Sequence, residues 1–142
     1  MKRIFLDTNV IIDFLEQREP FFKAAANVID LGAKQKIILY TSAISFLNCI
    51  YVIQKTIGYA KAVDSIKLLT QIIHVSPITN AEFFSALNVE SPDIEDVTQY
   101  YSAISVGCET IITPNAKDFP KDTICIVSPD EFLKQWSENT TD

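Results

Sequence analysis

Histidine, cysteine and glycine are scarce in this chain. Its 142 residues include 1 His, 3 Cys and 3 Gly. A zinc site built on several histidines is therefore excluded. The single histidine, His74, alternates with apolar residues in Ile72–Val75, which indicates a structural role. A Ser-His-Asp triad would depend on this one residue, and no nucleophile motif lies beside it.

The cysteines form no metal-binding or disulfide pattern. Cys49, Cys108 and Cys125 are odd in number and too far apart for a zinc knuckle. Each stands among apolar neighbours. We therefore expect three buried free thiols.

Long hydrophobic runs are also missing. No apolar stretch approaches the roughly 20 residues that a membrane-spanning helix needs, although hydrophobic residues make up 48% of the chain. The segment Met1–Leu6 carries two positive charges but reaches Asp7 too early for a secretory signal. We expect a cytoplasmic protein without membrane association. The high apolar fraction points to a partner surface beyond the core.

Basic residues are outnumbered by acidic ones. The chain has 12 Lys and Arg against 18 Asp and Glu, a formal net charge of −6. This balance argues against broad, charge-driven binding of nucleic acid, which usually needs a basic surface. It does not exclude nucleic acid, because a carboxylate cluster that holds a metal ion presents positive charge locally.

Strand-like and helix-like segments alternate along the chain, which predicts an α/β domain with a parallel sheet. The length suits one domain, which we place at residues 1–138 with a short polar tail at 139–142. The predicted strands are Arg3–Leu6, Ile37–Tyr40, Ile72–Val75, Thr110–Thr113 and Thr123–Val127. The predicted helices cover 9–16, 20–35, 42–57, 59–71, 79–88, 92–106 and 129–137.

Helix starts are marked by capping residues. Ser42 precedes one helix, and Thr79 with Glu82 forms a capping box. Ser91 stands before Pro92 at a predicted first helical position, and Ser128 precedes a Pro in the same way.

The first predicted strand ends in a carboxylate. The apolar run stops at Asp7, and Thr8 and Asn9 follow before the next helix. In open α/β sheets, ligands bind outside the carboxyl ends of the strands, where the strand order reverses. First and fourth strands are commonly neighbours at that point, so we expect Asp7 to lie near the residues that follow the fourth strand.

Three other segments carry polar side chains at suitable places. They are Asp93–Asp96 at a helix start, Thr113–Asp118 after the fourth strand, and Ser42–Asn48 after the second strand. Asp93 and Asp96 share a helical face. An oxygen-rich ligand set suits Mg²⁺ or Mn²⁺, and such an ion supports hydrolysis of a phosphodiester.

Each acidic residue also has a simpler interpretation. Asp7 could cap the helix that follows it, and Asp118 could end a turn before Phe119. The acids at 93, 95 and 96 could stabilise a helix N-terminus, worth about 0.3–1 kcal/mol each. The joint placement of three acidic sites at one edge of a sheet favours the metal site.

These segments together resemble the PIN domain (PilT N-terminus) family. The matching stretches are Leu6–Val10, Glu95–Asp96 with the helix that follows, and Thr113–Phe119. Arg18–Phe21 reads Arg-Glu-Pro-Phe, which is typical of one VapC-like subgroup. The resemblance implies a three-layer PIN fold, with a central parallel sheet of about five strands in the order 3-2-1-4-5 and about seven helices.

The resemblance also implies an activity and a site. PIN proteins of this size are Mg²⁺- or Mn²⁺-dependent ribonucleases that leave a 5′-phosphate, and many are toxins held inactive by an antitoxin. Carried over by motif, the implied catalytic carboxylates are Asp7, Asp96 and Asp118. The implied metal ligands are Asp7, Glu95, Asp96, Asn115 and Asp118. Asn9, Asn48 and Thr113 would support them, and Arg18 and Lys117 are candidate RNA contacts.

Two positions depart from the family pattern. Asn48 stands where many PIN nucleases have Glu, and it can ligate through its carbonyl but adds no charge. Asn is common here in the subgroup, and Glu95 would compensate. Pro114 replaces an Arg and removes a phosphate contact. These departures motivate an alternative: a catalytically weak or inactive PIN module that binds RNA or protein.

A third reading is a phosphatase of the haloacid dehalogenase type, which also places an Asp after its first strand. Those enzymes need Asp-x-Asp, and Asn9 at the second position cannot act as a general acid.

Under either PIN interpretation we expect a protein partner, as a homodimer or an antitoxin complex. The candidate surface aromatics are Phe21, Phe22, Phe46, Tyr51, Tyr59, Phe83 and Phe84. We expect at least half of them to lie in the core.

Overall fold

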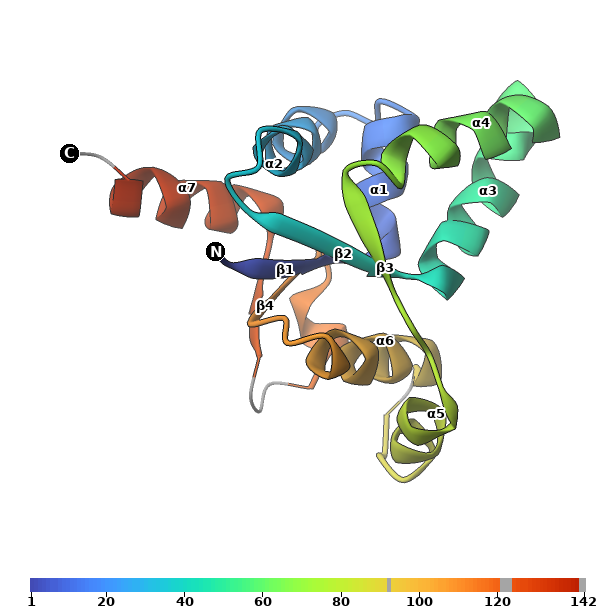
Figure 1. Cartoon of the computed structure of the whole chain (residues 1–142), viewed down its shortest axis with the longest axis vertical. Helices are drawn as coiled ribbons and strands as arrows, with labels where there is room; N and C mark the ends of the chain where they lie inside the picture. The colour runs from blue at the N-terminus through green and yellow to red at the C-terminus, as the bar shows by residue number, and fades with distance from the viewer. Residues whose placement is uncertain (92, 121–123, 141–142) are drawn as a thin grey trace.

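The computed structural model describes residues 1–91, 93–120 and 124–140, with the side chains of Asp118 and Thr140 left out. Strands and helices alternate along it (Figure 1). The strands are β1 (Arg3–Leu6), β2 (Ile38–Ser42), β3 (Ile73–Ser76), β4 (Thr110–Ile112) and β5 (Cys125–Val127). The helices are α1 (Thr8–Leu15), α2 (Phe22–Ala33), α3 (Ala43–Ile57), α4 (Tyr59–Leu69), α5 (Asn80–Leu87), α6 (Ile94–Ser105) and α7 (Pro129–Thr140), with a 3₁₀ helix, η1 (Ala116–Asp118).

The five strands form one sheet in the order β3-β2-β1-β4-β5, and every neighbouring pair is parallel. Strand β1 is therefore central. Leu6 pairs with Ile112, so β1 and β4 end side by side. The strand order and the α/β architecture predicted from the sequence are confirmed.

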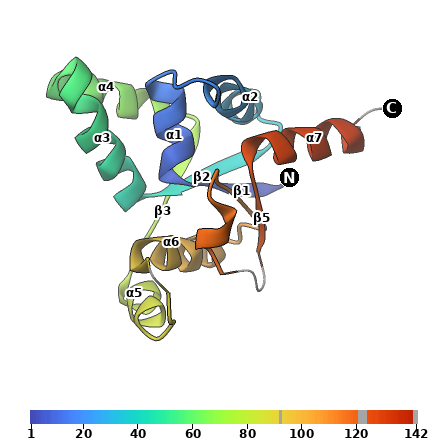
Figure 2. The same cartoon turned by 180° about the vertical axis from the view of Figure 1, so that it is seen from behind.

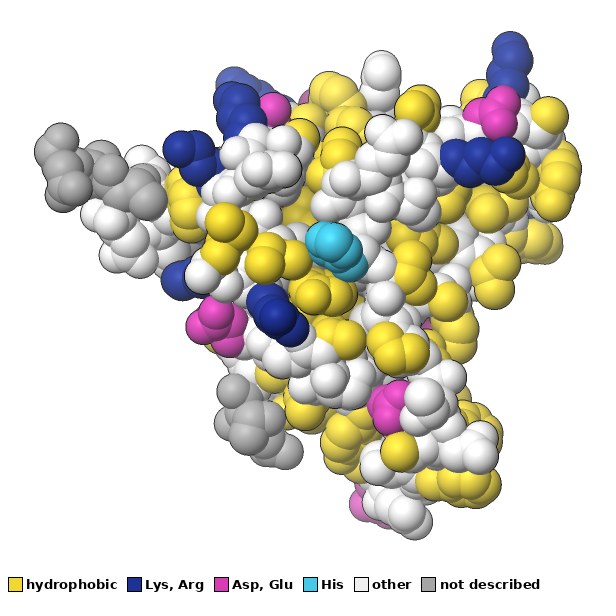
Figure 3. All heavy atoms as spheres, in the orientation of Figure 1, with side chains coloured by type: hydrophobic (Ala, Val, Ile, Leu, Met, Phe, Trp, Pro, Cys, Tyr) yellow, Lys and Arg dark blue, Asp and Glu magenta, His cyan; other side chains and the backbone are white. Residues whose placement is uncertain are grey.

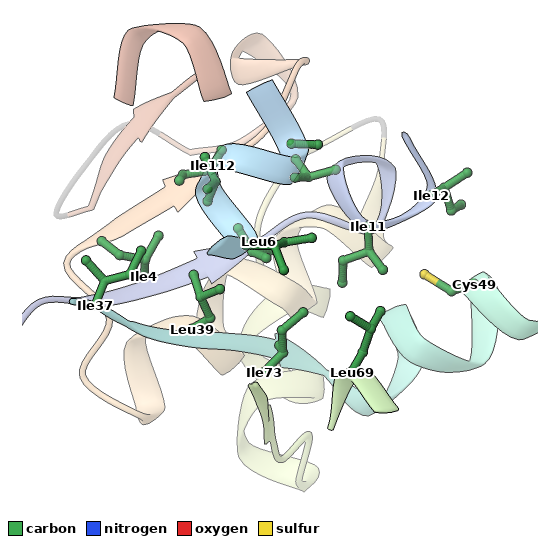
Figure 4. Close-up of a cluster of buried hydrophobic side chains, with 14 of the residues drawn as sticks. Ile4, Leu6, Ile11, Ile12, Ile37, Leu39, Cys49, Leu69, Ile73 and Ile112 are labelled. Carbon is green, nitrogen blue, oxygen red and sulfur yellow. The ribbon is translucent and has the colours of Figure 1, made fainter. Parts of the chain in front are cut away.

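Helices cover both faces of the sheet. Helices α1, α2, α3, α4 and α7 lie on one side, and α5 and α6 lie on the other (Figures 1 and 2). The larger core is aliphatic: Leu6, Leu39 and Ile73 project from three strands toward Ile11 of α1 (Figure 4). The second core packs Phe5 and other side chains of the sheet against α6. Fully burying one such side chain stabilises the fold by about 1.5–3 kcal/mol.

Most predicted helix starts are confirmed. Ser42 accepts a hydrogen bond from the Ser45 N–H at 3.1 Å, and Thr79 and Glu82 form the expected capping box. At α6 the predicted cap is wrong, because the side chain of Asp93, and not that of Ser91, accepts the capping hydrogen bond. The predicted first helical residue, Pro92, lies outside the described residues, as does Thr123 of the fifth predicted strand.

Helix α7 ends at Thr140, three residues beyond its predicted end. It therefore includes the first part of the predicted polar tail, and the remaining residues, 141 and 142, lie outside the described part. The division into one domain and a tail stays a prediction.

Two predictions about burial are wrong. Cys49 and Cys108 are buried, but Cys125 is exposed at the start of β5, the last strand of the sheet. Of the seven candidate aromatics, only Phe46 is buried and Phe22 is half-buried. The other five are exposed and belong to neither hydrophobic core, because they stand just before α2 or on the outer faces of α3, α4 and α5. Figure 3 shows hydrophobic side chains on the surface of α3, α4 and α5, and His74 exposed on β3.

No helix in the described ranges combines the length and the apolar character that crossing a bilayer requires.

Candidate active site

Asp7 lies at the end of β1, the central strand, and its side chain is buried, with 4% of the residue exposed. Its backbone carbonyl accepts from the Val10 N–H at 3.0 Å, so its main chain begins α1. Its carboxylate makes no capping hydrogen bond. Instead, Asp7 Oδ2 accepts from the Thr113 hydroxyl at 2.8 Å. The interpretation of this carboxylate as a helix cap is therefore wrong.

Thr113 links the ends of β1 and β4. It is fully buried, and it follows Ile112, which pairs with Leu6 just before Asp7. The Thr113 hydroxyl donates to Asp7 and accepts from the Asn115 N–H at 3.0 Å. One side chain therefore orients the carboxylate and fixes the turn that carries Asn115.

The N-terminus of α6 supplies the other acidic residues. Asp93 Oδ1 caps the helix by accepting from the Asp96 N–H at 3.2 Å. Glu95 and Asp96 stand in the first turn, where the helix dipole favours negative charge. This local stabilisation lets several carboxylates gather at one helix end.

A pocket of about 280 Å³ lies between these elements. It is lined by Asp7, Thr8, Asn9, Asp93, Glu95, Asp96, Gln99 and Asn115. Carboxylates from the end of β1 and from α6 thus converge with an amide from the segment after β4. The pocket lies where β1 and β4 end, as predicted from the strand order.

A chain of hydrogen bonds extends from the pocket into the interior. Glu95 Oε1 accepts from Asn48 Nδ2 at 2.6 Å and from Gln99 Nε2 at 3.4 Å. Gln99 Oε1 in turn accepts from the Ser45 hydroxyl at 2.9 Å, and Ser45 accepts from the Thr8 hydroxyl at 2.9 Å. The half-buried Asn48 thus contacts Glu95 directly.

Sequence reasoning gave no role in the site to three of these residues: Thr8, Ser45 and Gln99. It placed Asp93 on one helical face with Asp96 but did not assign it as a ligand. The same three-residue spacing from Asp96 was a usable signal for Gln99. Thr8 and Ser45 meet only because β1 and β2 are neighbours, which no local pattern in the sequence reports.

Cys49 packs beneath the site, and its Sγ lies 4.0 Å from the Thr8 carbonyl oxygen. Burial, together with the nearby Asp7 carboxylate, raises the pKa of this thiol to about 12. The thiol therefore stays protonated at neutral pH, and it is neither a nucleophile nor a thiolate ligand.

The basic residues predicted to contact RNA lie in different places. Lys117 is exposed on η1, two residues from Asn115. Arg18 lies beyond the far end of α1, where it pairs with Glu16 at 2.6 Å and lines a different pocket. The structure does not bring Arg18 to the acidic pocket. Asp118 stands on η1, but its side chain lies outside the described residues.

The donor chemistry of the pocket is that of a hard cation site, with carboxylate and amide oxygens and no sulfur. Among the side chains that the structure describes, no three His, Cys, Asp or Glu residues are grouped closely enough to hold a metal ion. The predicted third carboxylate, Asp118, is outside that set.

Comparison with known proteins agrees with this architecture. Residues 3–117 match the family described as PIN domain. The chain is 30% identical, over 141 residues and 96% of both proteins, to "Ribonuclease VapC1" of Aquifex aeolicus (strain VF5). The chain therefore belongs to the PIN-domain family. Within that family it is VapC-like.

Solved structures share the fold at low identity. One is Mycobacterium tuberculosis VapC20, described as a sarcin-ricin loop cleaving toxin, with a TM-score of 0.60, 16% identity, and coverage of 76% of this chain and 86% of that one. Another is a toxin-antitoxin complex from Klebsiella pneumoniae, with a TM-score of 0.64, 20% identity, and coverage of 89% and 97%.

Proposed function

We propose that the chain is a metal-dependent endoribonuclease of the VapC type that hydrolyses RNA phosphodiester bonds. The observation that carries the proposal is the pocket at the ends of β1 and β4, which the buried, oriented Asp7 lines together with Glu95 and Asp96. The 30%-identical relative named as a ribonuclease supports the same activity.

The residues have distinct roles in this proposal. Asp7, Asp96 and Asp118 would hold Mg²⁺ or Mn²⁺, with Glu95 and Asn115 assisting and Asn9 at the pocket wall. Thr113 keeps the Asp7 carboxylate turned toward Asn115. When bound, such an ion would activate water for attack on phosphorus and offset the charge of the phosphodiester. In the proposed reaction, water would add to phosphorus and lose a proton, and the bond to the 3′ oxygen would break as that oxygen takes up a proton, so the products would carry a 5′-phosphate and a 3′-hydroxyl.

In this proposal a divalent cation is needed because both the pocket and the RNA backbone are negatively charged. Carboxylates gathered at one pocket repel each other and also repel the RNA phosphates. A divalent cation relieves both repulsions, which explains how an acidic chain could act on an anionic substrate. Lys117, beside the pocket, is the candidate phosphate contact.

The test is cleavage of labelled single-stranded RNAs of varied sequence by purified chain with Mn²⁺, free of any antitoxin. We expect cleavage that EDTA abolishes and that the Asp7→Asn variant lacks. Asp64→Asn on α4 is the matched control, because it removes the same charge from an exposed site far from the pocket. Metal-independent cleavage, or none with any RNA, would contradict the proposal.

A second candidate is a PIN module that binds RNA or protein without cutting. Two observations favour it: Asn48 donates to Glu95 and adds no charge, and the described side chains contain no group of three metal-ligating residues. It predicts RNA binding without cleavage, and without loss of binding in Asp7→Asn.

We also propose that the chain has a protein partner, as a homodimer and as the toxin of a toxin-antitoxin pair in the cytoplasm. Its similarity to a toxin-antitoxin complex supports this. So do the large exposed side chains of α3, α4 and α5, among them Leu47, Tyr59, Leu68 and Phe84. Light scattering of the purified chain, alone and after co-expression with the product of any small reading frame that adjoins its gene, measures both assemblies.

A further inference from the structure

Glu95 is an exposed residue whose carboxylate is nevertheless held in place. Its Oε1 accepts from Asn48 Nδ2 of α3 at 2.6 Å and from Gln99 Nε2 of α6 at 3.4 Å. A surface glutamate normally samples several rotamers, and fixing it costs entropy. Two amide donors from two helices offset that cost, the Asn48 bond being the shorter and stronger one.

The Gln99 amide is hydrogen-bonded at both of its ends, which fixes its direction. Gln99 is 1% exposed, and its Oε1 accepts from the Ser45 hydroxyl. Ser45 has a single hydroxyl hydrogen, and its oxygen already accepts from Thr8 at 2.9 Å and lies 3.1 Å from the Ser42 hydroxyl oxygen. Since a carboxylate only accepts, Gln99 turns Nε2 toward Glu95, which leaves Oε1 as the acceptor for the Ser45 hydrogen. A flipped amide would set two acceptor oxygens against each other.

The direction of Asn48 follows from its partner. A carboxylate only accepts, so the atom that Asn48 presents to Glu95 at 2.6 Å is its N–H₂ group. Glu95 and Gln99 are among the residues that line the acidic pocket. The group that Asn48 turns toward this wall of the pocket is a donor, which cannot ligate a cation.

We propose that Asn48 and Gln99 are positioning residues that together hold Glu95 toward the acidic pocket, and that Ser45 acts through Gln99. This inference rests on the proposed function, because it assigns Glu95 to metal binding. The hydroxyls of Thr8, Ser42 and Ser45 lie in contact at the buried edge of the sheet, and through Gln99 they help to fix the position of the exposed Glu95. Loss of such a supporting contact typically weakens metal affinity by about 10–100-fold.

The first experiment compares two substitutions of Asn48, with Mn²⁺ affinity read from the electron paramagnetic resonance signal of the free ion. Asn48→Leu removes the donor, and we expect the Kd to rise about 10-fold. Asn48→Asp places a second carboxylate against that of Glu95, so we expect at least the same loss. Tighter Mn²⁺ binding by Asn48→Asp would show that position 48 is itself a ligand site and would overturn the proposal. Asn27→Leu and Asn27→Asp, on the exposed face of α2, are the matched controls.

The second experiment is a double-mutant cycle on the same Kd. Gln99→Met keeps the length of the side chain and removes both hydrogen bonds, and we expect a rise of about 3–10-fold, the smaller value reflecting the longer bond. Ser45→Ala should raise the Kd less, and the double variant should match Gln99→Met alone. Ser102→Ala controls for stability, because it removes a buried hydroxyl of α6 that bonds Ser76 and Pro77 instead.

A purely structural role gives a different result. The melting temperatures of Gln99→Met and Ser45→Ala would then fall while the Kd of the folded protein stayed unchanged, or the two effects on the Kd would add. Either outcome overturns the proposal. RNA cleavage by the wild type is measured alongside. If the wild type binds Mn²⁺ but does not cleave RNA, only the proposed function is contradicted. If the wild type cleaves RNA and the Kd is unchanged in Asn48→Leu and Gln99→Met, only the positioning role is contradicted. A wild type that binds no Mn²⁺ contradicts both.

Discussion

Helix α1 has a pocket at each end, and the two pockets differ in volume, in charge and in the burial of their charged residues. At its N-terminus, the buried Asp7 bonds the buried Thr113 and lines a pocket of about 280 Å³ with other carboxylates. At its C-terminus, Glu16 and Arg18 form an exposed ion pair beside a larger, mostly apolar pocket of about 440 Å³. The larger cavity is therefore not the one that the cluster of carboxylates lines.

The difference teaches where to look for function in this fold. An exposed ion pair is screened by water and contributes about 0–1 kcal/mol. A buried carboxylate must be hydrogen-bonded to be tolerated, so its orientation is built into the core. Substitutions at the two ends of α1 should therefore have very unequal effects, and the following predictions measure that inequality.

The largest effect is expected for Asp7→Asn. The amide keeps an oxygen that can accept from Thr113 but loses the charge that would bind the ion. We expect the single-turnover rate of RNA cleavage with Mn²⁺ to fall at least about 100-fold, the upper end of what loss of an indirect contact produces. The melting temperature should stay within a few degrees of wild type. Retention of more than a tenth of the rate would place the chemistry elsewhere.

Thr113→Val should have an intermediate effect on both activity and stability. Valine has the same shape, but it leaves Asp7 and the Asn115 N–H without the bridging hydroxyl. We expect about 10-fold slower cleavage and a free energy of unfolding in urea lower by about 1–3 kcal/mol. Thr113→Ser keeps the hydroxyl and should restore most of the rate. A defect in Thr113→Ser as large as that in Thr113→Val would mean that the methyl group contributes as much as the hydroxyl, and would contradict the bridging role.

Alkaline pH should lower the free energy of unfolding through Cys49, whose thiol packs against Thr8 at the N-terminal end of α1. Its folded-state pKa of about 12 exceeds the ordinary value of 9.0, so the folded protein keeps a proton that the unfolded chain releases. The stabilisation is complete below pH 9 and is lost as the pH rises through about 12, at up to about 1.4 kcal/mol per pH unit. Urea unfolding of Cys49→Ala across this range should show a shallower decline than wild type. A parallel decline would assign the loss to other groups.

The smallest effect is expected for Arg18→Ala at the C-terminal end. The Arg18–Glu16 pair is largely solvated, and we expect unfolding free energy to change by less than about 1 kcal/mol. Because Arg18 lies outside the acidic pocket, the cleavage rate should change less than 2-fold, whereas Lys117→Ala should raise the KM for RNA. A large loss of activity in Arg18→Ala would show that the RNA extends along α1 and would break the contrast between its two ends.

Local patterns were enough to predict the strands, a parallel sheet and the carboxylate at the end of the first strand, whereas the full strand order came from the resemblance to the PIN-domain family. The strand Arg3–Leu6 ends where the apolar run meets Asp7, and capping residues such as Thr79 mark helix starts because they bond backbone within three residues. The placement of Asp7 near Asn115 followed from the strand order, since β1 and β4 end together.

Contacts between distant segments could not be predicted in this way. Ser45 and Gln99 are 54 positions apart, and their hydrogen bond depends on how α3 and α6 meet around the sheet. Arg18 was predicted as an RNA contact because Pro114 replaces the Arg expected after the fourth strand. Helix α1 intervenes between Asp7 and Arg18, and its 8 residues span about 12 Å. The exposure of Cys125 likewise depends on β5 being the last strand of the sheet.

The three cysteines also allow the opening of the core to be followed by thiol labelling of the unmodified chain. Cys125 is exposed, whereas the pKa of Cys49 and of Cys108 is raised to about 12, chiefly by burial. At neutral pH a maleimide dye should therefore attach at one position without any substitution. Two further thiols become reactive only when the core opens, one in each of the two hydrophobic clusters. Counting labelled thiols over time would thus reveal whether the two faces of the sheet separate together or one after the other.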